Sequence, residues 1–172
     1  EISPSRLHKA ALYLGADVPF LLTGGTAVAS GIGEKLYPIA NKENLHFIVV
    51  KPQEGLSTRA IFSQVDVNHL ASWPDTHNFV SALEAGNLRE LGVYSGNSLE
   101  PIATEMLPVI GQIKRDIEAM DAIYAAMTGT GSAVFGVFDS KLAALRAYEE
   151  LVGRYDYVEY AFSVPNGVEL FL

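Results

Sequence analysis

The chain has 172 residues, of which 49% are hydrophobic and 19% charged, with no cysteine and a formal net charge of −8. A chain of this length buries roughly 70% of its unfolded surface, so we expect a conventional core. The acidic balance and the lack of a basic cluster argue against a nucleic-acid partner, and the apolar runs are too short to span a membrane. Without cysteine, disulfides and thiolate sites are excluded, and the cytoplasm is the expected location.

The first 44 residues predict a helix followed by a hairpin. Residues 3–15 have the spacing of a short amphipathic helix that Gly15 can terminate. Asp17 then lies where this helix gives way to an extended segment. The stretches "PFLLT" and "TAVAS" flank Gly24 and Gly25, so we expect a tight hairpin over residues 19–30.

Residues 45–122 predict one strand and then mostly helix. The β-rich run at 45–51 is broken by "PQEG" before a short helix capped by Ser57 or Thr58. Helical spacing follows at 75–87 and again at 98–121. In the second of these segments, Pro108 and Gly111 are expected to interrupt the helix.

The last third of the chain alternates strands with one helix. The expected elements are a strand at 123–127, a glycine loop "TGTGS" at 128–132, a strand at 133–138, a helix from an Asp139 cap to residue 154, and a strand at 155–164. Strands that come in hairpins favour an α+β sheet with helices on one face. From residue 45 onwards we expect a ferredoxin-like split βαβ arrangement.

Several common catalytic motifs are absent from the sequence. His8, His46, His69 and His77 show no metal-ligand spacing, so surface or structural roles are expected for them and no metal ligand is assigned. The sequence also lacks the G-x-S-x-G elbow of serine hydrolases, the G-x-x-x-x-G-K phosphate loop and the complete dinucleotide fingerprint. Serine hydrolase, classical P-loop and Rossmann functions are therefore excluded.

Three stretches contain residues that could be functional. For each of them, the residues alone allow both a structural and a functional interpretation. "TGTGS" is either a tight turn of small residues or a loop whose glycines let backbone N–H groups approach an anion. Asp17 either hydrogen-bonds its local backbone at a helix end or has a functional role. Phe62 on the short helix "STRAIF" is either a core residue or a residue of a binding site.

The order and spacing of these stretches resemble one known family. "GADVPF…GGTAVASGIGEKL", "KPQEGLSTRAIF" and "MTGTGSAVFGVF", with "NSLEPIA" at 97–103, are similar to motifs of the 4-diphosphocytidyl-2-C-methyl-D-erythritol kinases, within the GHMP kinase superfamily. The resemblance spans nearly the whole chain. It implies that residues 1–44 are the tail of the GHMP kinase N-terminal domain and that residues 45–172 are its C-terminal domain.

The resemblance also implies an activity and the residues that perform it. The family transfers the γ-phosphate of ATP to a hydroxyl of the methylerythritol moiety in the non-mevalonate isoprenoid pathway. Asp17 matches the catalytic aspartate that accepts or orients the hydroxyl proton. Thr58 and Phe62 match the substrate side, where the aromatic ring stacks on cytosine. The phosphate-side loop comprises Gly129, Thr130, Gly131 and Ser132.

The resemblance implies ATP and Mg²⁺ as cofactors and a small cytidyl compound as substrate. The family's lysine and its long ATP loop belong upstream of residue 1. Because the sequence begins at Glu1 rather than Met, we expect it to be part of a longer protein. Because the lysine and the ATP loop are not in this sequence, we expect the chain alone to be inactive as a kinase. The alternatives are another GHMP kinase of the homoserine or mevalonate type, and a non-catalytic ferredoxin-like ligand-binding or interaction module.

Overall fold

The structure is a computed structural model that describes residues 3–40, 44–66 and 73–168. The chain forms two compact units, residues 1–43 with 163–172 and residues 44–162. Within the described ranges, no helix is both long and apolar enough to cross a bilayer.

The first unit contains two helices and a two-stranded antiparallel ribbon. Its elements are α1 (Pro4–Leu14), α2 (Val18–Thr23), β1 (Ala27–Ser30) and β2 (Lys35–Pro38). The predicted hairpin over residues 19–30 is wrong, because "PFLLT" is helical. Pro19 lies in the first turn of α2, where a missing N–H costs no intrahelical bond. The ribbon instead pairs Ala27 with Pro38 and Ser30 with Lys35.

Gly24 and Gly25 end α2 and also let another segment pass closely. Their φ angles of 68° and 70° lie in the region that favours glycine. The N–H of Gly24 donates to the Phe20 carbonyl at 2.7 Å, and the N–H of Gly167 donates to the Thr23 carbonyl at 3.3 Å. A Cβ on Gly24 would lie only 1.9 Å from the backbone nitrogen of Gly167. This close approach requires glycine.

The second unit is built on a four-stranded antiparallel sheet. Its elements are β3 (His46–Lys51), α3 (Thr58–Ser63), α4 (Thr76–Glu84), α5 (Leu88–Tyr94), α6 (Glu100–Met106), α7 (Val109–Glu118), β4 (Tyr124–Met127), β5 (Val134–Phe138), α8 (Lys141–Val152) and β6 (Tyr157–Phe162). The strand order is β4-β5-β3-β6, with every neighbouring pair antiparallel. This is the order of a split βαβ sheet, so the ferredoxin-like α+β prediction is confirmed.

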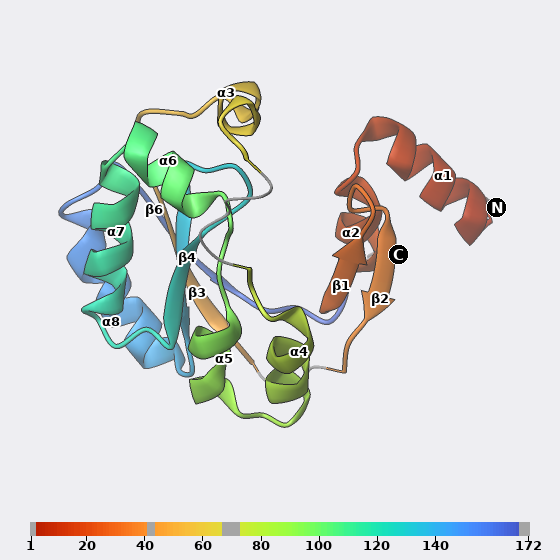
Figure 1. Cartoon of the computed structure of the whole chain (residues 1–172). Helices are drawn as coiled ribbons and strands as arrows, with labels where there is room; N and C mark the ends of the chain where they lie inside the picture. Colours follow the sequence, from red (N-terminus) through yellow and green to blue (C-terminus); the bar gives the residue numbers. More distant parts are fainter. Residues whose placement is uncertain (1–2, 41–43, 67–72, 169–172) are drawn as a thin grey trace. The chain divides into compact units, whose positions relative to one another are not determined.

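Helices α7 and α8 cover one face of this sheet (Figure 1). The core beneath them is apolar, and β3 contributes Ile48 and Val50, which are fully buried. Helix α7 contributes three isoleucines at helical spacing, Ile110, Ile113 and Ile117, all without exposed surface. The main core therefore lies between the inner face of the sheet and these two helices.

Helices α4 and α5 belong to a second apolar cluster on the other face. Phe135 and Val137 of β5 point into it, because side chains alternate along a strand, and Leu83 and Leu91 close it from the helices. Tyr124 stands edge-on to both Phe79 and Phe135. The expectation of helices on one face only is wrong, because the aromatic residues of β4 and β5 also need cover.

Three local predictions in the helical region change. Helix α5, from Leu88 to Tyr94, was not predicted. Pro108 separates α6 from α7 as expected, but Gly111 lies inside α7, where a Cβ would come within 2.9 Å of Thr104 Cγ2. The glycine therefore permits close helix packing and does not break the helix. Ser140, and not Asp139, caps α8, because its hydroxyl accepts the Ala143 N–H at 3.2 Å.

Candidate functional site

The glycine-rich loop joins β4 to β5 in the second unit. The N–H of Thr128 donates to the Ala133 carbonyl, and the N–H of Gly131 donates back to the Thr128 carbonyl, both at 3.0 Å. Gly129 and Gly131 have φ angles of 56° and 83°. The N–H groups of Gly129, Thr130 and Ser132 donate to no acceptor in the described part of the chain. Successive free N–H groups in a turn are the arrangement that accepts an anion.

Helix α3 contacts this loop through hydroxyl groups. The Oγ1 atoms of Thr58 and Thr130 lie 3.0 Å apart. The structure thus brings together one residue predicted for the substrate side and one predicted for the phosphate side. Ser132 is 3% exposed, and its hydroxyl donates to the Glu54 carbonyl at 2.7 Å. That hydroxyl is occupied in fastening the loop, so the free anion donor of Ser132 is its backbone N–H.

Phe62 is an exposed residue of α3 and does not belong to the core. Its side chain is 58% exposed, whereas the preceding Ile61 is fully buried. Ser57 caps the helix by accepting the Ala60 N–H at 3.4 Å. Burial of Ile61 and this cap hold α3 in place and leave an aromatic face available to a flat ligand.

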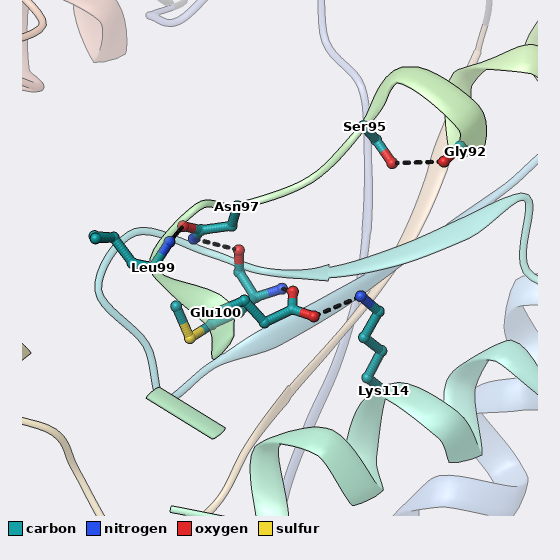
Figure 2. A network of polar contacts seen from close by, with 7 residues as sticks. Gly92, Ser95, Asn97, Leu99, Glu100 and Lys114 are labelled. Atoms are coloured by element: carbon teal, nitrogen blue, oxygen red, sulfur yellow. Dashed lines mark hydrogen bonds and ion pairs between the residues drawn. The ribbon is translucent and has the colours of Figure 1, made fainter. Parts of the chain in front are cut away.

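Asn97 holds the start of the glycine loop through hydrogen bonds of its amide group (Figure 2). Its amide group donates to the carbonyls of Met127 at 2.9 Å and Gly129 at 2.7 Å. Its oxygen accepts the Leu99 N–H at 2.9 Å, a local turn of the kind asparagine favours. All of the hydrogen-bonding groups of this amide are therefore engaged.

Glu100 adds a charged support to the same strand end. One carboxylate oxygen accepts the Met127 N–H at 2.9 Å, and the other pairs with Lys114 Nζ of α7 (Figure 2). The side chains of Glu100 and Lys114 are 15% and 30% exposed. Partial burial makes this charge-assisted contact stronger than a surface ion pair.

The sequence reasoning noticed "NSLEPIA" but assigned no role to its residues. An asparagine three residues before a glutamate at a helix start does point to a turn and an N-terminal acid. The partners of Asn97 and Glu100 lie about thirty positions away, since Asn97 to Met127 spans 30 and Glu100 to Met127 spans 27. Local spacing cannot reveal such partners, and it gave no indication of Lys114.

Asp17 belongs to the first unit, at the junction of α1 and α2. It occupies the N-cap position of α2, yet its side chain makes no capping hydrogen bond. A Cβ on Gly33 would lie 3.5 Å from Asp17 Oδ1, so the β1–β2 turn passes beside the carboxylate. In the same turn, N–H groups of Glu34 itself and of Ile32 lower the pKa of Glu34. Because the Asp17 side chain makes no capping hydrogen bond, helix capping does not explain the presence of an aspartate at this position.

The histidines take separate positions. His46 Nδ1 lies 2.8 Å from the Tyr160 hydroxyl, and their rings stack across β3 and β6. His8 and His77 are exposed, and His69 lies outside the described residues. Among the residues that the structure describes, no group of three or more His, Cys, Asp or Glu side chains is suited to a metal ion.

The comparisons with known proteins agree with this geometry. Residues 79–156 match the family profile described as "GHMP kinases C terminal". The matched residues lie within the second unit, residues 44–162. Curated relatives named 4-diphosphocytidyl-2-C-methyl-D-erythritol kinase include one from Caldicellulosiruptor bescii, 36% identical over 150 residues, and one from Clostridium botulinum strain Loch Maree, 36% identical over 155 residues. The matches cover 87% and 90% of the chain.

Solved structures show the same GHMP kinase fold. A crystal structure of 4-(cytidine 5'-diphospho)-2C-methyl-D-erythritol kinase matches with a TM-score of 0.78 and 28% identity, over 94% of this chain and 57% of that one. Homoserine kinase from Cytophaga hutchinsonii matches with a TM-score of 0.71 and 17% identity, over 87% of this chain and 51% of that one, and supports the fold alone. The chain spans about half the length of the curated relatives it matches, 52% and 55%.

Proposed function

We propose that this chain contributes the catalytic aspartate and the C-terminal domain to a kinase that phosphorylates 4-diphosphocytidyl-2-C-methyl-D-erythritol. The supporting observation is the contact between two predicted sites, in which the Thr58 and Thr130 hydroxyls lie 3.0 Å apart. The names of relatives at 36% identity support the same substrate. In this proposal residues 1–44 are the tail of the N-terminal domain and residues 45–172 are the C-terminal domain.

The phosphate side of the proposed site is the glycine loop. The free N–H groups of Gly129, Thr130 and Ser132 suit phosphate oxygens, and the glycines allow close approach of the backbone. ATP, when bound, supplies the phosphoryl group that is transferred. The described residues offer no carboxylate cluster for Mg²⁺, so no ligand set in this chain is assigned to it.

Asp17 is the proposed residue for the attacking hydroxyl. A carboxylate without a capping bond can accept the hydroxyl proton or fix its direction. Phosphoryl transfer through a loose transition state depends mostly on positioning and charge, so a strong base is unnecessary. Replacing Asp17 by Asn preserves shape and removes the negative charge.

Phe62 is the proposed platform for the cytosine ring, and Thr58 is its polar neighbour. Stacking of a base on an aromatic side chain contributes about 1–3 kcal/mol. This proposal places both ligands in a cell interior such as the cytoplasm. It assigns no further macromolecular partner and no oligomeric state.

Calorimetry on the 172-residue chain tests the substrate assignment. Cytidine diphosphate should bind, Phe62→Ala should weaken it by about tenfold or more, and pyrophosphate binding should change little. Val93→Ala is a matched control, since Val93 is an exposed apolar residue of α5, 77% exposed. Equal weakening of both ligands by Phe62→Ala would favour another GHMP kinase. Absence of any cytidine diphosphate binding would favour a non-catalytic module.

A coupled assay tests the role of the chain in catalysis. The chain alone is expected to consume no ATP with the cytidyl substrate, because its relatives are about twice as long. Substrate-dependent ATP consumption that Asp17→Asn abolishes would contradict the expected inactivity and would support the role of Asp17. Consumption that Asp17→Asn leaves unchanged would contradict the role of Asp17.

A further inference from the structure

A cavity of about 540 Å³ lies beside the glycine loop within the second unit. Its walls come from Pro74, helix α4, the end of α5, the 95–98 segment, and strands β4 and β5. Thr128 and Gly129 border it on the loop side. Cavities that hold small organic ligands measure about 300–1,000 Å³, so this one has the volume of a ligand site.

The walls are aromatic and uncharged. Four rings contribute, Phe79, Tyr94, Tyr124 and Phe135, and none of the described lining residues carries an ionisable acid or base other than the tyrosines. Tyr124 stands edge-on to Phe79 at 6.1 Å and to Phe135 at 5.9 Å between ring centroids. Such walls favour a flat, uncharged ring over an ion, because a charge here would lose hydration without gaining a partner.

The polar side chains in the walls are neutral. Six of them carry hydroxyls, Thr76, Tyr94, Ser95, Ser98, Tyr124 and Thr128, and that of Ser95 donates to the Gly92 carbonyl at 3.3 Å. Burial raises the pKa of Tyr124 to about 12, so its phenol keeps its proton at neutral pH and acts as a donor. The amide of Asn97 also borders the cavity but is engaged elsewhere. A few hydroxyls among apolar walls are the polar groups that orient a heterocycle.

We propose that this cavity binds a small, neutral, planar heteroaromatic molecule, at a site separate from the Phe62 face. The volume, the four rings and the uncharged walls carry the proposal together. Because Asn97 and Gly129 border both the cavity and the loop, an occupant lies against groups that shape the glycine loop. The proposal does not rest on the function proposed above, although Gly129 borders both sites.

Benzimidazole, uncharged at slightly alkaline pH, is the probe, titrated into the 172-residue chain. Trp73 is the only tryptophan of the sequence, and the next residue, Pro74, lines the cavity. We expect a saturable change in Trp73 fluorescence. Backbone amide NMR should show the largest shifts at Gly96 and Gly129 and none at Gly153. Cyclohexanol, similar in size but not planar, should bind at least about tenfold more weakly.

Gly96→Leu blocks the proposed site. A Cβ at Gly96 would make ordinary contact with Pro74 Cγ at 3.7 Å, so the larger side chain fits the backbone and extends beside the cavity wall. Affinity for benzimidazole should fall about tenfold or more. Gly153→Leu is the matched control, since its Cβ would meet only the Glu150 carbonyl at 3.8 Å on α8. This control should bind like the parent.

Three results would overturn the proposal: no saturable change, equal binding of cyclohexanol, or amide shifts that avoid Gly96 and Gly129. If Gly96→Leu does not fold, the amide shifts of the parent chain still decide the location. Shifts concentrated at Phe62 would assign benzimidazole to the helix α3 face and contradict a separate site. Cytidine diphosphate binding, measured on the same sample, tests the proposed function. A failure of the cavity proposal can therefore be distinguished from a failure of the proposed function.

Discussion

The hydroxyls of Thr58 and Thr130 share a hydrogen bond of 3.0 Å across 72 positions of sequence. It joins the first turn of α3 to the tip of the glycine loop. Two motifs that the sequence presents separately are therefore neighbours, and we expect an energetic coupling between their side chains.

A double-mutant cycle with Thr58→Val and Thr130→Val measures this coupling. Because the contact is exposed to solvent, we expect about 0.5 kcal/mol in the free energy of unfolding, obtained from urea titrations. The control pairs Thr130→Val with Ser63→Ala, whose hydroxyl bonds to Ala60 within α3. That pair should be additive, and additivity of the first pair as well would contradict the contact.

Substitution of Gly131 should destabilise the loop. Gly131→Ala places a Cβ 2.7 Å from Met127 Sδ at a φ of 83°, so we expect a loss of about 1–3 kcal/mol in urea unfolding. Gly55→Ala is the matched control, because nothing lies within 4 Å of its Cβ. It should be neutral or slightly stabilising. A Gly131→Ala variant as stable as the parent would show that this loop conformation is wrong.

Loss of the Asn97 amide should loosen the start of the loop. Asn97→Ala leaves the carbonyls of Met127 and Gly129 without their donor, and we expect a cost of about 1–3 kcal/mol. Amide hydrogen exchange should accelerate in residues 127–133 more than in α8. Asn78→Ala, which removes one exposed bond to Asp75, serves as the control and should leave exchange in the loop unchanged.

Alkaline pH should destabilise the fold through two tyrosines. Burial raises the pKa of Tyr124 to about 12, and burial with the hydrogen bond to Asp116 raises that of Tyr155 to about 12, against an ordinary value of 10.0. Their stabilisation is complete below pH 10 and is lost as pH rises towards 12, because the unfolded phenols ionise first.

Urea titrations between pH 8 and 11 check this prediction, with the range set by the two shifted pKa values. Tyr124→Phe and Tyr155→Phe should each make the alkaline decline in unfolding free energy shallower. Tyr13→Phe is the control, since Tyr13 is 95% exposed on α1, and it should not alter the curve. An unchanged decline in both test variants would assign the alkaline loss to other groups.

The strands of the sheet were predictable because β3, β5 and β6 carry dense apolar or alternating patterns along the sequence. Helix α2 was not predictable, since "PFLLT" has no polar face and its length suits either a helix or a strand. In the structure Ala27–Ser30 pair with Lys35–Pro38 and not with residues 19–23, which form a helix with Pro19 in its first turn.

Part of the candidate site was also predictable from the sequence, and part was not. Glycines and hydroxyls of the "TGTGS" loop were visible as composition, and their resemblance to a family gave them a role. The ion pair between Glu100 and Lys114 could not be predicted from the sequence. Glu100 also accepts the N–H of Met127, which lies 27 positions away, and no local pattern indicates such a contact. Contacts between residues far apart in the sequence form only in the folded chain, so they produce no periodic pattern that the sequence could reveal.

The bond between Gly167 and Thr23 bears on how the protein is made. The first unit takes its residues from both ends of the chain, with the second unit inserted between them. During synthesis on the ribosome, the second unit is complete once residue 162 has emerged, whereas α2 waits for its last neighbour until residue 167 appears. The first unit, whose first residues precede those of the second, therefore receives its last residues after the second unit is complete.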